Sequence, residues 1–248
     1  MTETLTAIPE HLPLEPQEID SFSGYRIEPV IDALVKRSNL QLASCLDVGC
    51  GTRPMKSWFH KFSKASMPSY IGVETDEQIL AHLAQQGVDA INPFTTKRDL
   101  SSDLVLAMEV IEHIKPADSA SFFEFCAQNT KKVFALTTPN FEYWQNLKAT
   151  GDTTGCRWVP DHFKDFRPNS NNSHHHKQEM TPELVLSYLS VAFPKPNWEY
   201  RVFRAWPWSI ADLAQNKNWS LYFKIFGLAW RVSEEESIEP EKKIIKDR

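Results

Sequence analysis

The feature that most constrains the fold of this chain is a regular alternation of short apolar segments with longer amphipathic ones. The apolar segments are bounded by Gly, Pro or acidic residues, and they predict strands at 44–49, 69–74, 103–108 and 132–139. Around and between them, apolar residues recur at helical spacing and predict helices at 25–38, 55–64, 76–87 and 116–130. Strands separated by helices form βαβ units, whose parallel sheet is covered on both faces. The alternation therefore predicts an α/β fold with a doubly wound sheet.

The chain is expected to fold as one domain, because 248 residues can bury a single sizeable core. We expect an extended N-terminal arm over residues 1–21, the domain over 22–232, and a solvated charged tail over 233–248. Within the domain, residues 140–178 are rich in Gly, Pro, Asn and aromatic residues and show no periodicity. Such a segment predicts a long functional loop.

Regular structure is expected again after this loop. Thr181 and Pro182 have the residue types that favour the N-cap and the first position of a helix. Two further strands are then expected at 198–206 and 220–232. A three-histidine run such as 174–176 in an Asn-rich loop is more often exposed to solvent than ligating, but His176 lies only five residues before Thr181.

Charge and cysteine content narrow the class of protein. The formal net charge of -5 gives no broad attraction for nucleic acid. The 4 cysteines form no C-x-x-C pair, and the first residues lack the basic and apolar regions of a signal peptide, so we expect a cytoplasmic protein. No apolar run approaches the roughly 18 residues of a membrane helix. We therefore expect no membrane partner.

A glycine-containing segment, LDVGCGT at 46–52, lies where the first predicted strand turns into a helix. Gly49 and Gly51 would allow close approach of the backbone, and Asp47 would offer an acceptor at the strand end where open α/β sheets bind ligands. The next strand ends at Glu74, which either accepts hydrogen bonds from a ribose or, with Asp76, caps the following helix. The segment lacks both the third glycine of dinucleotide sites and the Gly-Lys-Ser/Thr of nucleotide triphosphate sites. This favours an adenosine ligand without phosphates.

Three segments, LDVGCGT, IGVETD and DLVLAMEVIEH, resemble the motifs of class I S-adenosylmethionine-dependent methyltransferases. The resemblance extends over nearly the whole chain and implies a mostly parallel, seven-stranded, Rossmann-like sheet whose last strand is antiparallel. It also implies that S-adenosylmethionine is the cofactor. Asp47, Gly49 and Gly51 would contact its methionine part, Glu74 its ribose, and Met108 would complete the cofactor site. Arg53 departs from the usual small residue, and adenine contacts are unassigned.

The segment EVIEH places Glu109, Glu112 and His113 after the strand at 103–108. On a helix their spacing would put all three on one face, and their donor atoms suit a divalent ion such as Mg²⁺, Mn²⁺, Fe²⁺ or Zn²⁺. The alternative is that Glu112 and His113 are only the polar start of a helix. A further histidine from the loop, above all His176, would favour the metal.

The order EVIEH, TTPNFEYW and HHHKQEMTPEL resembles that of the HUA-enhancer-type methyltransferases, which methylate the 2′ hydroxyl at the 3′ end of small RNAs. The resemblance implies that Glu109, Glu112, His113 and His176 hold a divalent metal against the terminal ribose, and that His113 or His176 acts as catalytic base where it is not a ligand. His175 and Gln178 depart from the family pattern. Basic residues expected to flank this edge are Lys131, Lys132, Lys148, Arg157, Lys164 and Arg167.

Two other functions fit the same sequence. One is a metal-independent O-, N- or C-methyltransferase for a small molecule, with His113 or His162 as base and an aromatic-lined pocket. The other is a non-catalytic methyltransferase-like module that binds a partner. The intact Asp47, Gly49, Gly51 and Glu74 argue against the second of these.

Overall fold

The computed structural model describes residues 11–13, 31, 34–35, 40–63, 65–150, 175–206, 209–212 and 224–232. Most of the expected N-terminal arm, most of the helix expected at 25–38, loop residues 151–174 and the expected tail at 233–248 lie outside the described residues. Ile31 and Leu34, inside that expected helix, are helical and buried.

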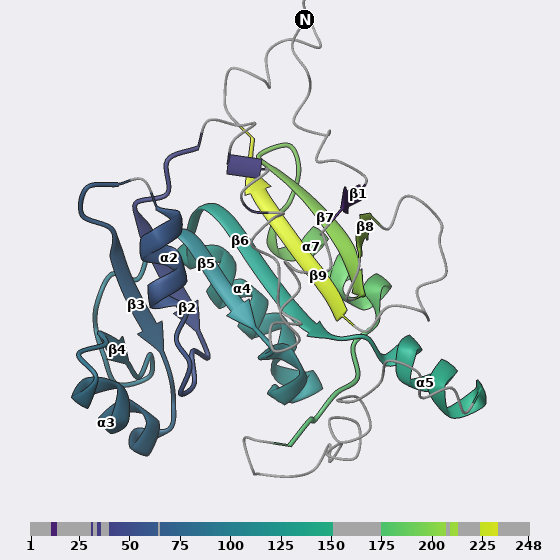
Figure 1. Cartoon of the computed structure of the whole chain (residues 1–248), viewed down its shortest axis with the longest axis horizontal. Helices are drawn as coiled ribbons and strands as arrows, with labels where there is room; N and C mark the ends of the chain where they lie inside the picture. Colours follow the sequence, from purple (N-terminus) through teal and green to yellow (C-terminus); the bar gives the residue numbers. More distant parts are fainter. Residues whose placement is uncertain are drawn as a thin grey trace, which may run out of the picture.

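The described strands form one sheet in the order β1-β8-β7-β9-β6-β5-β2-β3-β4 (Figure 1). From β4 to β7 it is a mostly parallel, seven-stranded sheet in which the last strand, β9, lies antiparallel between β6 and β7. The predicted α/β architecture is therefore confirmed. The strand bounds are β1 His11–Pro13, β2 Ser44–Val48, β3 Ser69–Val73, β4 Ala90–Ile91, β5 Ser102–Met108, β6 Thr130–Pro139, β7 Trp198–Trp206, β8 Ser209–Asp212 and β9 Lys224–Arg231.

Three short strands were not predicted. β4 pairs in parallel with β3. With only two residues, β4 is too short for an alternating pattern to reveal it. β8 pairs antiparallel with β7, and β1 pairs antiparallel with β8, so they extend the sheet beyond the parallel core. Pairing between β1 and β8 joins distant parts of the chain and leaves no local pattern in the sequence.

Helices cover both faces of the sheet (Figure 1). On one face, Phe123 of α4 and Val185 of α7 belong to a core cluster with the buried residues of the strands. On the other face, Phe59 of α2 packs in a second cluster with Ile31 and Leu34. This confirms the doubly wound arrangement. The helix bounds are α2 Lys56–Phe62, α3 Glu77–Gln85, α4 Ser119–Asn129, α5 Phe141–Thr150 and α7 Pro182–Ala192, with 3₁₀ turns η2 Ile111–His113 and η3 Pro116–Asp118.

The expected irregular loop at 140–178 is corrected at both ends. Residues 141–150 form α5, whose helical start is supported by a hydrogen bond from the Glu142 backbone N–H to Oδ1 of Asn140. Residues 175–180 are ordered against the domain, and α7 then begins as predicted, with Thr181 Oγ1 accepting from the Leu184 N–H. The loop therefore leaves the sheet as a helix and returns next to the end of β6, where the Phe141 N–H donates to the Met180 carbonyl.

Candidate active site

The turn after β2 uses its two glycines differently. Both have positive φ, 68° at Gly49 and 53° at Gly51, which side chains rarely adopt. A Cβ at Gly49 would lie 2.6 Å from Cγ2 of Val110, whereas a Cβ at Gly51 would meet no described residue within 4 Å. Gly49 is thus required for packing against the segment after β5. Gly51 borders open space, and a ligand can approach the backbone there.

Asp47, expected to contact the cofactor, has its carboxylate bound within the protein. Its side chain is 2 % exposed, and Oδ2 accepts hydrogen bonds from the Met55 N–H at 2.9 Å and from the Tyr70 hydroxyl. Burial raises the pKa of Asp47 to about 6, against the lowering effect of these two hydrogen bonds. The contacts fix both ends of the glycine turn. A direct contact between Asp47 and the cofactor stays a prediction.

Glu74 connects the glycine turn to the next helix. Oε2 accepts from the Gly51 N–H at 3.1 Å, and Oε1 accepts from the N–H groups of Thr75 at 2.6 Å and Asp76 at 3.1 Å. The N-cap of α3 is Asp76, whose Oδ1 accepts from two N–H groups in the first turn. Glu74 is therefore not the helix cap, and its carboxylate lies beside the open side of Gly51. Its role toward a ribose stays a prediction.

Glu109 does not share a helical face with Glu112 and His113, which corrects the expected geometry. Glu109 has a φ of 57° and directly follows β5, and its N–H donates to the Thr137 carbonyl at 2.9 Å. Its carboxylate contacts Nζ of Lys224 instead. A helical spacing cannot apply because the chain turns sharply between Glu109 and η2.

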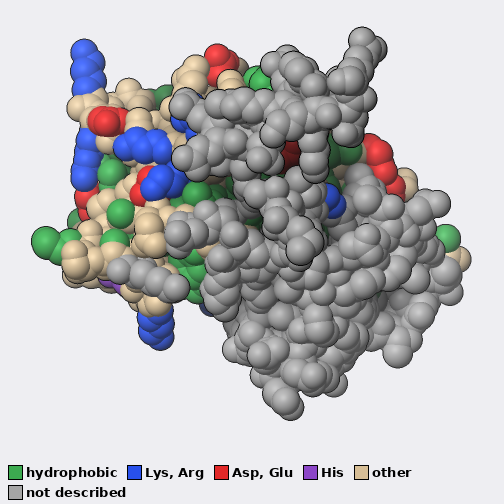
Figure 2. Space-filling view, turned by 90° about the horizontal axis from the view of Figure 1, so that it is seen from above, with side chains coloured by type: hydrophobic (Ala, Val, Ile, Leu, Met, Phe, Trp, Pro, Cys, Tyr) green, Lys and Arg blue, Asp and Glu red, His purple; other side chains and the backbone are tan. Residues whose placement is uncertain are grey.

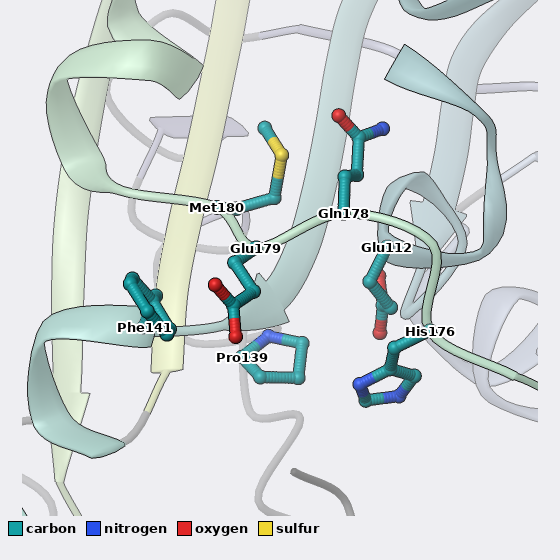
Figure 3. A pocket seen from close by; sticks show the side chains of 7 residues that line it. All are labelled: Glu112, Pro139, Phe141, His176, Gln178, Glu179 and Met180. Carbon is teal, nitrogen blue, oxygen red and sulfur yellow. The ribbon is translucent and has the colours of Figure 1, made fainter. Parts of the chain in front are cut away.

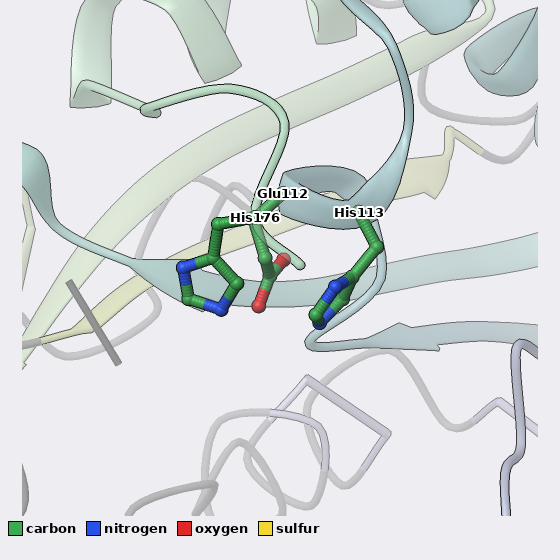
Figure 4. Close-up of side chains that lie close together, drawn as sticks. All are labelled: Glu112, His113 and His176. Carbon is green, nitrogen blue, oxygen red and sulfur yellow. The ribbon is translucent and has the colours of Figure 1, made fainter. Parts of the chain in front are cut away.

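Glu112, His113 and His176 come together at the carboxyl edge of β5 and β6 (Figure 4). One donor atom from each lies within 4.8 Å of the others. Glu112 and His113 belong to η2, while His176 belongs to the segment that returns from the loop. The loop histidine therefore folds onto this cluster, although the sequence distance gave no direct sign of it.

Backbone contacts hold the returning segment against η2. The Lys177 N–H donates to the Glu112 carbonyl at 2.7 Å. His113 Nδ1 lies 3.3 Å from the His175 carbonyl, and because a carbonyl only accepts, Nδ1 carries the proton. The lone pair of the neutral ring is then on Nε2, the nitrogen suited to a metal or to a proton. The His113 and His176 rings meet edge to face, with centroids 4.9 Å apart.

Gln178 holds the returning segment in place, which the sequence did not reveal. Its buried Nε2 donates to the Ile111 carbonyl at 2.7 Å and to Ser119 Oγ at 2.8 Å. These bonds attach the strand-like segment behind His176 to η2 and to the start of α4. The sequence contained one signal, a glutamine between a polar loop and an apolar helix, but a glutamine there is equally compatible with exposure to solvent.

The charges of the site are concentrated in a dry environment. Burial raises the pKa of Glu112 above its ordinary value, and the nearby Glu109 raises it further, while Lys224 and the hydrogen bond from Thr138 Oγ1 lower it. Glu112 is 2 % exposed. A divalent cation would favour the ionised carboxylate, and one oxygen with two imidazole nitrogens is a donor set for Mn²⁺, Fe²⁺ or Zn²⁺ rather than for Mg²⁺. The residues present therefore fit such an ion.

A small pocket adjoins this cluster (Figure 3). Glu112, Glu179 and His176 point the same way in it. Apolar side chains complete the wall, so the pocket offers both charge and hydrophobic contact. Its lining residues are Glu112, Pro139, Phe141, His176, Gln178, Glu179 and Met180.

Two of the basic residues expected near this edge lie elsewhere. Lys131 and Lys132 stand at the amino end of β6, whereas the site is at its carboxyl end, and Lys132 pairs with Asp103 at 3.1 Å. Arg157, Lys164 and Arg167 lie outside the described residues. Lys and Arg side chains in Figure 2 lie mainly over the end of the molecule with α2, β3, β4 and α3, with Asp and Glu among them. Among the described helices, none has the length and apolar character needed to cross a bilayer.

The fold is shared with several solved methyltransferases. A chain of the Pnkp1/Rnl/Hen1 RNA repair complex superposes with a TM-score of 0.52 at 17% identity, over 81% of this chain and 40% of that one. The plantazolicin methyltransferase BpumL gives 0.53 at 13% identity, over 80% of each chain. A methyltransferase from Clostridium acetobutylicum gives 0.52 at 13% identity, over 81% of this chain and 88% of that one. This chain thus spans less than half of the RNA repair chain.

Sequence comparison identifies the family. No curated protein is detectably similar in sequence to this chain. The methyltransferase domain model, however, matches residues 19–210, which include the glycine turn, the Glu112–His113–His176 cluster and most of the sheet. The chain therefore belongs to the methyltransferase domain family.

Proposed function

We propose that this enzyme transfers the methyl group of S-adenosylmethionine to a ribose hydroxyl at the 3′ end of an RNA, with a divalent metal held by Glu112, His113 and His176. The observation that carries the proposal is the return of His176 onto Glu112 and His113, with donor atoms within 4.8 Å of one another. A polar helix start alone would not explain a buried histidine from a distant segment. The resemblance of EVIEH and its following segments to 3′-terminal RNA methyltransferases supports the acceptor.

The donor is proposed to lie over the turn after β2. Gly51 leaves its side of the turn open, and Glu74 stands beside it with a carboxylate that can also accept from ribose hydroxyls. The hydrogen bonds of Asp47 with Tyr70 and Met55 keep the turn in place. The turn and the Glu112 cluster both lie at the carboxyl edge of the parallel strands. The methyl donor and the methyl acceptor would therefore meet at this edge of the sheet.

The residues of the cluster would act on the acceptor hydroxyl. When bound, a divalent metal would supply Lewis acidity and would orient the 2′ and 3′ oxygens. His113 is oriented to bind the ion through Nε2, because its Nδ1–H is directed to the His175 carbonyl. The acceptor oxygen forms a bond to the methyl carbon while the carbon–sulfur bond breaks, and the electron pair stays on sulfur to give S-adenosylhomocysteine. The hydroxyl proton leaves to a histidine that is not a ligand or to water.

The test is methyl transfer to short RNAs that end in a 2′,3′ diol, a 2′-deoxy or a 3′-deoxy nucleotide, after chelation and after addition of Mn²⁺. We expect transfer only to RNAs that keep the 2′ hydroxyl, loss of activity with chelator, and recovery with Mn²⁺. His176→Ala should reduce activity at least about 100-fold. His175→Ala is the matched control, since it keeps the carbonyl that contacts His113. Full activity after chelation and in His176→Ala would refute the metal.

A small-molecule acceptor is the second candidate, and a specific observation favours it. Pro139, Phe141 and Met180 form an apolar wall beside Glu112 and His176, which suits a planar aromatic hydroxyl compound. The net charge of -5 also disfavours a wide RNA surface. Transfer to a phenol or catechol, with none to any RNA of the panel, would select this function whether or not a metal proved necessary.

A further inference from the structure

Lys224 is a buried cation next to the proposed metal site. It is the first residue of β9 and is 2 % exposed. Because β9 runs antiparallel, its amino end lies at the same edge as the carboxyl ends of β5 and β6, and Lys224 pairs with Pro139 in the register of the sheet. A lysine at this position of the last strand therefore enters the acceptor side of the fold.

The ammonium of Lys224 is directed to Glu109. Its Nζ contacts Oε2 of Glu109, and the side chains of this pair are 3 % and 14 % exposed. The other oxygen, Oε1 of Glu109, is buried and has no hydrogen-bond partner among the described residues. A buried carboxylate oxygen without a partner is costly unless a cation satisfies it. In Glu109, one carboxylate oxygen, Oε1, therefore could accept a cation, while Lys224 already neutralises the other oxygen, Oε2.

Glu109 is the one member of the EVIEH acidic cluster that does not gather with Glu112, His113 and His176. Glu112 nevertheless lies nearby, because its Oε2 accepts from Thr138 Oγ1, and Thr138 directly precedes Pro139, the register partner of Lys224. Two carboxylates and one lysine thus share a small buried volume. A divalent ion at Glu112 and the ammonium at Glu109 are both positive, so they compete for the same negative charge.

We propose that Lys224 is a positioning residue that retains Glu109 and so limits the metal site to three protein ligands. This inference rests on the proposed metal-assisted function. Three protein ligands would leave a bound ion able to take acceptor oxygens as further ligands. If Lys224 is removed, Glu109 becomes available as a fourth protein ligand and the repulsion between the ammonium and the ion disappears. The chain then binds the metal more tightly.

The experiment is calorimetric titration of the full chain with Mn²⁺ after treatment with a chelator, without substrate or activity measurement. We expect Lys224→Met to bind Mn²⁺ at least about tenfold more tightly than the wild type, because a carboxylate ligand is gained and a repelling charge is lost. Lys224→Arg keeps the cation and is the matched control, with a Kd within about threefold of the wild type. Adding Glu109→Gln to Lys224→Met should remove the gain.

Two further measurements keep the test decisive if Lys224→Met is unstable without metal. Thermal denaturation of that variant should then show a larger rise of Tm on addition of Mn²⁺ than the wild type shows. Glu109→Gln alone leaves the Lys224 ammonium without its carboxylate, so the repulsion should weaken Mn²⁺ binding, by less than about tenfold. A loss of more than about tenfold in Glu109→Gln, or equal affinity of Lys224→Met and the wild type, would overturn the inference.

The outcomes separate this inference from the proposed function. Binding of Mn²⁺ by the wild type, with no gain in Lys224→Met, refutes only the role of Lys224. Binding by Lys224→Met alone supports the role of Lys224 and refutes a metal in the wild-type enzyme. No binding of Mn²⁺ by any of the variants refutes both.

Discussion

Replacing Gln178 by leucine tests how the returning segment is held in place. Gln178 Nε2 donates to the Ile111 carbonyl at 2.7 Å and to Ser119 Oγ at 2.8 Å. Leucine has a similar size but donates no hydrogen bond, so the fully buried Ser119 Oγ loses its donor and the Ile111 carbonyl keeps only the Ile114 N–H. Loss of a partner costs about 1–3 kcal/mol for each buried acceptor. Because the Ile111 carbonyl keeps the Ile114 N–H as a donor, we expect a total of about 2–3 kcal/mol.

For a chain of 248 residues, this loss corresponds to a fall of Tm of about 5–12 °C. The metal affinity should fall as well, because the bond between Gln178 and Ile111 connects the two segments that carry His176 and Glu112. Ile111 directly precedes Glu112, and Gln178 lies two residues after His176. Thermal denaturation gives the first quantity and titration with Mn²⁺ gives the second. We expect the Kd for Mn²⁺ to rise about tenfold or more, as it does when groups that orient metal ligands are removed.

The matched control is Gln128→Leu. Gln128 also donates from Nε2 to a single side-chain acceptor, Glu124 Oε1 at 3.1 Å, but on the exposed side of α4. This change should lower Tm by less than about 2 °C, since exposed hydrogen bonds are replaced by bonds to water. Equal shifts of Tm in the two variants, with unchanged metal affinity, would refute the argument that Gln178 positions His176.

Two further predictions concern the turn after β2. The pKa of Asp47 is raised from 3.8 to about 6 in the folded protein, so between these pH values the folded state binds more protons than the unfolded state, and the free energy of unfolding should increase as the pH falls from about 7 to about 4. Asp47 alone contributes about 3 kcal/mol to this change. Urea unfolding at several pH values should therefore show a smaller change in the free energy of unfolding between about pH 7 and about pH 4 for Asp47→Asn than for the wild type. Identical changes in the two proteins would contradict the prediction. Tyr70→Phe removes the hydroxyl that donates to Asp47 and should weaken S-adenosylmethionine binding about three- to tenfold by calorimetry, whereas Tyr200→Phe on β7 should leave it unchanged. Equal affinities in the two tyrosine variants would remove Tyr70 from the donor site.

Most of the parallel sheet could be predicted from the sequence, because each strand is a short buried apolar run and each helix carries its own periodicity. β5 is buried along almost its whole length, and α7 begins at the cap and proline that mark it in the sequence. α5 was missed because its residues mix aromatic, polar and amide side chains without a clear apolar face. β1 and β8 were missed because their pairing depends on contacts between distant segments.

For the candidate site, only the placement of residues that follow strand ends could be predicted from local sequence. Gly49, Gly51 and Glu74 follow strand ends, and strand ends of a parallel sheet share one edge. Glu109, by contrast, has a left-handed backbone conformation that breaks the helical spacing assumed for it. Its pairing with Lys224 joins β5 to β9 and follows from the antiparallel direction of the last strand, which no local pattern near Glu109 expresses.

The turn after β2 and the segment that contains Glu112 pack together through Val110. This residue lies between Glu109 and η2, and its side chain fills the space that a Cβ at Gly49 would occupy. Gly49 is thus needed less for approach of a ligand than for close packing of the segment after β5 against the turn. Alanine at this position would face both a left-handed φ of 68°, worth about 1–2 kcal/mol, and a 2.6 Å contact with Val110. Since Val110 and Glu112 belong to one short segment, displacement of Val110 also moves the cluster. Gly49→Ala should therefore weaken both donor and Mn²⁺ binding, whereas Gly87→Ala, with the same φ of 68° but open space around it, should affect stability alone.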